Sequence, residues 1–337
     1  MRSKYLGVTI LVVMLAVMVV PTTTYAETKF FAIATGGTAG TYYPLGGALA
    51  QALSSKIEDL EVTAQTGNAS VANCNLINDH EIESAFVQNN VAYWAYTATG
   101  VFEGKEPIEN LRAIASLYPE VFQLVATKSS GIKSFADLKG KRVSPGDRGS
   151  GTESDFRSMT KVLGMSYDDF GSVDYLSLGG AVERMKDGQV DFLIFTGGYP
   201  TSGIIDLGTS VDLTYISIPD EERAKIKEAL PYVIELVIPA GTYPGQEEDV
   251  KTLSVVAQWV VDADVSDDLV YEITKALWEK GEVKKGSSKG QMKTGAEIMA
   301  EVHAKGKEVT LETALAGNAI PLHAGAEKYY KEIGVVK

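Results

Sequence analysis

The chain has 337 residues, of which 45% are hydrophobic and 22% are charged. This composition is typical of a folded globular protein, and the length suggests two domains of ordinary size. The formal net charge is −13, and such an acidic chain is a poor candidate for binding nucleic acid, whose phosphates require a basic face.

Residues 1–26 have the pattern of a secretory signal peptide. Two positive charges, Arg2 and Lys4, precede an uncharged and mostly apolar run over residues 5–20, and Ala26 ends a cleavage-site pattern of small residues. An uncleaved membrane anchor is the alternative, but this run is shorter than the about 20 residues that span a bilayer. We therefore expect cleavage after Ala26 and export to the periplasm, which takes the formal charge from −13 to −15.

The chain then alternates short strand-like runs with helical runs. In chain order we expect strands at 29–34, 61–65, 84–87, 111–115 and 121–127, with helices at 44–57, 71–78 and 89–98 between them. A second series follows, with a short helix at 135–138, strands at 141–144, 172–175, 190–194 and 214–218, and helices at 152–163, 181–186 and 220–230. A long strand at 254–261 and helices from Ser266 to near Tyr330 complete the chain. This order predicts a mainly parallel sheet with helices on both faces.

Two α/β units of similar layout, without a low-complexity linker, predict two lobes joined by crossing strands. We place the crossings near 117–127 and 254–261, so that the second lobe is inserted into the first. The expected division is lobe I at 27–123 and 258–337 and lobe II at 124–257. Ligand sites often lie in the cleft between such units.

Polar, glycine-rich segments follow five of the predicted strands. They are Thr35–Pro44, Gln65–Ser70, Val87–Asn90, Ser144–Glu153 and Phe195–Thr201. Ligands of open parallel sheets bind at the carboxyl ends of the strands. Any one segment is equally explained as a turn, so the prediction of a binding site depends on their convergence.

The segment around Ser150 indicates what kind of group binds. Gly146 and Gly151 have the spacing of a phosphate loop, but Thr152 stands where the lysine belongs, which disfavours a nucleoside triphosphatase. Successive N–H groups at Ser150–Thr152 would instead form a nest for one carboxylate. An ordinary capping box, with Glu153 reaching back, is compatible with this role. Arg148 either faces the cleft and pairs with a carboxylate or is a solvated loop residue.

The sequence offers few residues for thiol, metal or nucleophile chemistry. Cys74 is the one cysteine, and we expect it to be a small core residue in a helix. His80, His303 and His323 are scattered without metal-ligand spacing, and no hydrolase or zinc motif is present. We expect no cofactor, no metal and no catalytic residues. An enzyme acting on a small acid on the same fold, and a structural or adhesive surface protein, remain the alternatives.

Several segments together resemble the TAXI family of solute receptors from tripartite ATP-independent periplasmic (TRAP) transporters. The resemblance is carried by residues 35–38, 41–47, 67–73, 87–88, 92–94, 115–120, 137–143, 149–153, 238–243, 267–271 and 320–326. It covers nearly the whole mature chain. Asp147 and Arg148 depart from the family pattern, which tends to have uncharged residues there.

The resemblance implies an α/β, type II periplasmic-binding-protein-like fold, with two lobes, a hinge and a ligand cleft between the lobes. It also implies delivery of the solute to an integral membrane TRAP subunit driven by an ion gradient. Expected solutes are small organic acids or amino acids of the glutamate, glutamine and 2-oxoglutarate class, bound by loop amides and hydroxyls. The expected ligand-binding residues are Gly37, Thr38, Tyr42, Asn68, Ser70, Gln88, Ser150, Gly151, Thr152, Thr196, Gly197 and Gly198.

Overall fold

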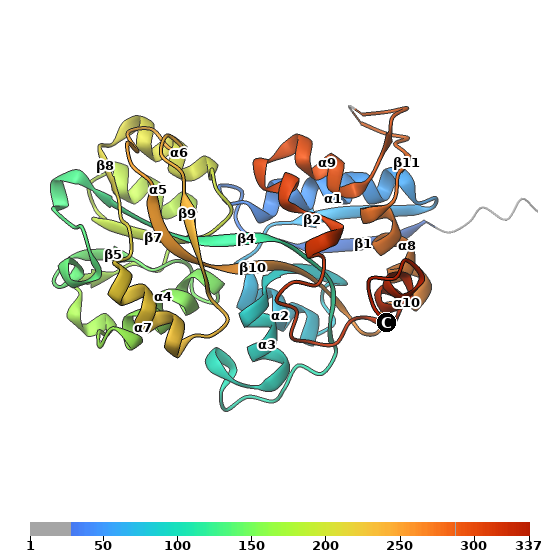
Figure 1. Cartoon of the computed structure of the whole chain (residues 1–337), viewed down its shortest axis with the longest axis horizontal. Coiled ribbons are helices and arrows are strands. Elements are labelled where there is room, and N and C mark those ends of the chain that lie inside the picture. The colour runs from blue at the N-terminus through green and yellow to red at the C-terminus, as the bar shows by residue number, and fades with distance from the viewer. Residues whose placement is uncertain (1–27, 287) are drawn as a thin grey trace, which may run out of the picture.

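The computed structural model describes residues 28–286 and 288–337, in which one ten-stranded sheet runs through the molecule (Figure 1). The strand order is β2-β1-β3-β10-β4-β7-β5-β6, with β8 beside β4 and β9 beside β10. The strands are β1 (Lys29–Ala34), β2 (Leu60–Gln65), β3 (Ser84–Gln88), β4 (Leu111–Thr127), β5 (Arg142–Ser144), β6 (Ser172–Val173), β7 (Phe192–Gly197), β8 (Leu213–Tyr215), β9 (Ile234–Ile238) and β10 (Val250–Asp262); β11 (Gly281–Glu282) and β12 (Met292–Lys293) form a separate pair. The expected signal peptide and its cleavage site lie outside the described residues.

Helices cover both faces of the sheet and divide into two groups (Figure 1). They are α1 (Tyr42–Lys56), α2 (Ser70–Asn78), α3 (Asn89–Thr97), α4 (Gly151–Val162), α5 (Leu178–Lys186), α6 (Ser202–Ser210), α7 (Asp220–Ala229), α8 (Asp267–Trp278), α9 (Gly295–Val302) and α10 (Ala324–Glu332). Around β1–β3, helices α1, α8, α9 and α10 share one core and α2 and α3 share another; this half is lobe I. Around β5–β7, α4 and α7 share one core and α5 and α6 another; this half is lobe II.

Strands β4 and β10 are long and belong to both lobes. Along β10, residues 257–261 pair with β3 of lobe I, and along β4, residues 121–126 pair with β7 of lobe II. The two strands also pair with each other over most of their length. Both expected crossings therefore lie in these two strands. The expected lobe boundaries, 123/124 and 257/258, fall inside them and stay a prediction.

The expected mainly parallel sheet is wrong in its centre. Pairs within each lobe, β1 with β2 and β3, and β5 with β6 and β7, are parallel. The crossing strands β4 and β10 are antiparallel to β3, β7 and each other. The reason is the path of the chain, because β4 leaves lobe I and β10 returns to it. Apolar periodicity carries no information on strand direction.

Strand β4 is one continuous strand where two were expected. Pro119 lies between the two expected strands, and proline cannot donate to a ladder. In the structure Pro119 pairs with Val256 beside a register shift between Val256 and Gln258, and such irregularities are where sheets tolerate proline. Helix α6 and strand β9 were not expected at all, and both are short elements.

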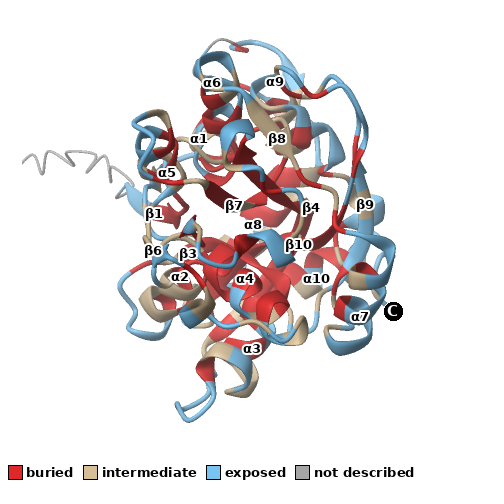
Figure 2. Cartoon of the chain, turned by 90° about the vertical axis from the view of Figure 1, so that its left-hand side faces the viewer, coloured by how far each residue is buried: buried red, intermediate tan, exposed pale blue. Residues whose placement is uncertain are grey.

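The core follows the expected amphipathic patterns. Leu45, Leu49 and Leu53 of α1 are fully buried against the sheet, as their four-residue spacing predicts. Figure 2 shows buried residues along the central strands β4 and β7, while exposed residues mark the outer turns. Within the described residues, no helix combines the length and apolar character needed to cross a membrane.

Phe156 of α4 offers a test of the lobe II core. Its ring is fully buried and lies within 6.2 Å, centroid to centroid, of the rings of Phe135, Phe170 and Phe192. We expect Phe156→Ala to lower the free energy of unfolding by about 3–5 kcal/mol, because it leaves a cavity in a packed cluster. Urea denaturation followed by circular dichroism measures this loss. Phe30→Ala, at a side chain that is 76% exposed, is the control and should change stability by less than about 0.5 kcal/mol.

Candidate functional site

A cavity of about 330 Å³ lies between the two lobes, and its walls are the segments that follow the sheet strands. Ten of the twelve expected ligand-binding residues line it, namely Gly37, Thr38, Tyr42, Asn68, Ser70, Gln88, Ser150, Gly151, Thr152 and Thr196. Lobe I contributes the segments after β1, β2 and β3, and lobe II those after β5, β6 and β7. The carboxyl ends of the strands therefore meet at one place, as expected for an open α/β sheet.

Gly197 and Gly198 do not line the cavity. The ring of Phe195 packs over Gly197, where an added Cβ would lie 2.4 Å from the ring. Gly198 packs against Thr41 and Lys305, and its carbonyl accepts a hydrogen bond from Thr41 Oγ1 at 3.0 Å. A ligand-binding role for these two glycines stays a prediction: Gly198 packs against residues of lobe I, and Gly197 packs against Phe195 of its own strand.

The N-terminus of α4 presents free donors to the cavity. Ser150 is the N-cap and its hydroxyl accepts a hydrogen bond from the Glu153 N–H at 3.1 Å. Gly151 and Thr152 are the first two residues of the helix, so their N–H groups have no acceptor within it. The helix dipole adds a partial positive charge here, which favours a carboxylate.

The second half of the expected capping box is wrong. The Glu153 carboxylate does not reach back to the N-cap but accepts hydrogen bonds from Arg157 at 2.6 Å and from Tyr167 at 3.0 Å. Because Glu153 is held inside lobe II, the N–H groups at the start of α4 stay available to a ligand.

The wall after β2 contains a strained residue. Ala69 has φ of 63° and ψ of −148°, a conformation that residues with a Cβ rarely adopt. It precedes α2 and lies between two cavity-lining residues, Asn68 and Ser70. Strain of this kind is concentrated at binding sites, where the surrounding structure holds the backbone in place.

Glu120 and the segment Leu176–Gly179 line the cavity but were not expected as site residues. Glu120, in the middle of β4, lines the cavity, and its Oε2 accepts a hydrogen bond from the Tyr42 hydroxyl at 2.8 Å. Burial raises the pKa of the Glu120 carboxyl well above its usual range and also raises the pKa of the Tyr42 phenol. Leu176–Gly179, after the short strand β6, also line the cavity; a strand was expected at 172–175, but the segment after it was not assigned to the site.

Asp155, one turn into α4, supports the cavity wall from behind. Its carboxylate accepts hydrogen bonds from Gln88 Nε2, Asn90 Nδ2 and Thr196 Oγ1, each at 3.0 Å. Burial raises the pKa of Asp155 to about 7, although these hydrogen bonds act in the opposite direction. Two of the three donors, on Gln88 and Thr196, belong to residues that line the cavity.

No lysine, arginine or histidine lines the cavity of the described chain. Arg148 is exposed and its guanidinium stacks 3.7 Å from the centre of the Tyr175 ring. Lys305 packs behind Gly198 and pairs with Glu308 at 2.7 Å. An anionic group in the cavity would therefore be held by backbone N–H groups and hydroxyls.

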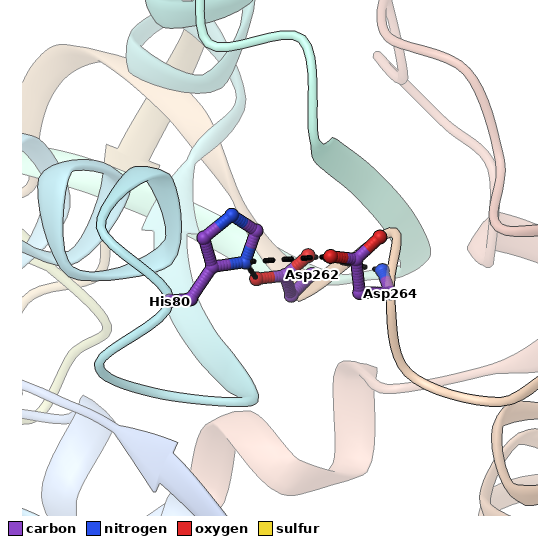
Figure 3. Close-up of side chains that lie close together, drawn as sticks. All are labelled: His80, Asp262 and Asp264. Atoms are coloured by element: carbon purple, nitrogen blue, oxygen red, sulfur yellow. Dashed lines mark hydrogen bonds and ion pairs between the residues drawn. The ribbon is translucent and has the colours of Figure 1, made fainter.

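Other reactive groups lie away from the cavity. Cys74 is fully buried in the core of lobe I, as expected, and burial raises the pKa of its thiol. His80 contacts Asp262 and Asp264, with Nδ1 2.6 Å and 3.7 Å from their carboxylates (Figure 3). Since Asp262 also accepts the Asp264 N–H, these side chains tie the turn after α2 to the end of β10.

The fold and the cavity together define the class of protein: a two-lobed, periplasmic-binding-protein-like α/β protein. The chain is similar to the binding protein component of an ABC phosphonate transporter from Pseudomonas aeruginosa, with 14% identity, a TM-score of 0.51, and coverage of 92% of this chain and 98% of that chain. It is also similar to a periplasmic transporter, with 11% identity, a TM-score of 0.52, and coverage of 92% and 94%. A model of the NMT1-like family matches residues 33–334, and the chain belongs to this family.

The Tyr42–Glu120 contact can be tested by removing one hydroxyl. We expect Tyr42→Phe to lower the free energy of unfolding by about 1–3 kcal/mol, because the buried Glu120 carboxyl loses a hydrogen-bond donor. Chemical denaturation measures the change. The neighbouring Tyr43, which is 36% exposed, gives the matched control: Tyr43→Phe should have little effect. Equal losses in the two variants would contradict this account of the contact.

Proposed function

We propose that this chain is the periplasmic solute receptor of a transporter, which binds a small organic acid or amino acid and delivers it to a membrane subunit. The observation that carries the proposal is the cavity between the lobes, with orphan N–H groups and hydroxyls directed from strand ends of both lobes. Its volume of about 330 Å³ falls in the range of small-molecule sites. The family and the fold support this role.

The ionisable groups that line the cavity favour one class of solute over another. A carboxylate would bind the N–H groups of Gly151 and Thr152 at the start of α4. Glu120 and Asp147 line the same cavity, and no lysine, arginine or histidine among the described residues does. Because burial favours the neutral form of Glu120, an ammonium group beside it would stabilise the ionised form and be held by it, whereas a second carboxylate would find no compensating charge. We therefore favour an amino acid such as glutamate or glutamine over a dicarboxylate such as 2-oxoglutarate.

The transporter type follows from the resemblance of the sequence to TAXI receptors. Under this proposal the partner is an integral membrane TRAP subunit and the signal peptide directs the chain to the periplasm. Closure of the lobes over the solute would present one composite surface to that partner.

Thermal-shift and calorimetric titrations with L-glutamate, L-glutamine, 2-oxoglutarate and succinate test the proposal. We expect the amino acids to raise the melting temperature and the two dicarboxylates without an amino group to raise it less, since a ligand stabilises the state it binds. No shift with any of the four would contradict the proposed class of solute. Recovery of the bound compound unchanged, by chromatography, separates a receptor from an enzyme acting on a small acid.

The role of Glu120 is tested by Glu120→Gln. This variant keeps the shape of the side chain but cannot ionise, so it lacks the anion that an ammonium group would stabilise. We expect it to weaken amino-acid binding about tenfold while changing 2-oxoglutarate binding little. Isothermal titration calorimetry gives both affinities. Arg148→Gln, at a side chain that stacks on Tyr175 outside the cavity, is the control and should leave both affinities unchanged.

A further inference from the structure

The carboxylate of Asp155 joins the two lobes. Asp155 and Thr196 belong to α4 and β7 of lobe II, whereas Gln88 and Asn90 stand at the end of β3 and the start of α3 in lobe I. Both amide groups of lobe I donate to this single carboxylate at 3.0 Å. All three donors can hydrogen-bond to this buried carboxylate only while the two lobes are in contact.

Gln88 of lobe I is also in close van der Waals contact with the start of α4 in lobe II. A Cβ added at Gly151 would lie 1.9 Å from Gln88 Oε1, so the Gln88 side chain packs directly on the backbone at the start of α4. The interlobe junction is therefore closely packed, and Asp155 itself is only 1% exposed.

Among the described residues, the groups that face Asp155 include acids but no cation. Glu153 of α4 and Glu120 of β4 act on it through charge, and the hydroxyl of Tyr232 faces it from the segment after α7. Its other neighbours on β3, α3 and β7 are the uncharged groups of Gln88, Asn90 and Thr196. Arg157 compensates the charge of Glu153, but its guanidinium is half-exposed and pairs with Glu153, not with Asp155.

The same junction can accept a neutral carboxyl. Gln88 Oε1 and Asn90 Oδ1 are buried and have no hydrogen-bond partner among the described residues. A protonated Asp155 is a donor, and rotation of either amide by half a turn would bring its oxygen to accept that proton. Both protonation states of Asp155 thus have a hydrogen-bonded arrangement in the closed form.

We propose that Asp155 is a positioning residue that couples closure of the lobes to the uptake of one proton. Its carboxyl holds Gln88 of lobe I against Gly151 and Thr196 of lobe II, and this completes the wall of the cavity. The coupling concerns closure itself and does not depend on which solute binds.

The sign of the coupling follows from burial. In the closed form the pKa of Asp155 is raised to about 7, and in an open form, where water reaches the carboxyl, it would fall toward its ordinary value of about 3.9. The closed form therefore binds the proton more tightly. Lowering the pH from 8 to 6 should shift the equilibrium toward the closed form by about tenfold. Global stability should follow the same direction, falling as pH rises from about 4 to about 7.

Small-angle X-ray scattering of the full mature chain without solute tests the coupling. We expect the radius of gyration to be smaller at pH 6 than at pH 8, and we expect Asp155→Asn, which is neutral at every pH, to abolish this difference. Asp191→Asn is the matched control: it changes a partly buried aspartate of lobe II whose partner, Arg142, also lies in lobe II. This control should keep the pH dependence.

A second measurement, on the wild-type protein, tests the coupling even if Asp155→Asn does not fold. In wild-type protein labelled with ¹³C at the aspartate carboxyl, one aspartate should titrate near pH 7 by NMR. A radius of gyration independent of pH, a full pH dependence in Asp155→Asn, or the absence of such an aspartate would each overturn the coupling. Because none of these measurements uses a solute, they can fail or succeed independently of the proposed receptor function.

Discussion

The antiparallel pairing of β4 with β10 is the interaction on which the rest of the structure depends. Each strand belongs to the sheet of both lobes, so the lobes share one continuous ladder of hydrogen bonds at their junction. The strands flanking this pair, β3 and β7, end beside it and bring Gln88 and Thr196 to the cavity. A change in the relative orientation of the lobes must therefore be absorbed by twist or bending of two strands. This limits the motion to a narrow set of directions.

Much of the site could be predicted because its chemistry is local in the sequence. Glycines and hydroxyl residues directly after strands, as at Gly37 and Ser150, identify strand-end loops, and the topology of α/β sheets brings such loops together. The residues that escaped prediction act through distant partners. Glu120 lies in the part of β4 that falls between the two expected strands, 111–115 and 121–127. Asp155 has the sequence context of an ordinary helical residue, and its donors are more than 40 positions away.

The fold follows the same rule: features set by neighbouring residues were predicted, and features set by distant parts of the chain were not. Apolar spacing predicted α1 and its buried face, whereas strand direction and the continuity of β4 depend on the path of the chain through both lobes. The two glycines that were assigned to the site, Gly197 and Gly198, show a related limit. A glycine at a strand end leaves room for either a ligand or a neighbouring side chain. Only the surrounding residues, here Phe195 and Lys305, show which of the two occupies that room.

The origin of the cavity walls in two different lobes has a kinetic consequence. The N–H groups of α4 come from lobe II, while Tyr42 and the loop before it come from lobe I. Neither lobe alone surrounds a solute, so an open molecule offers only half of the contacts. A bound solute then leaves only after the lobes open, and its hydrogen bonds to both lobes slow that opening. A membrane partner that holds the lobes apart would thereby release the solute without competing for any group that binds it.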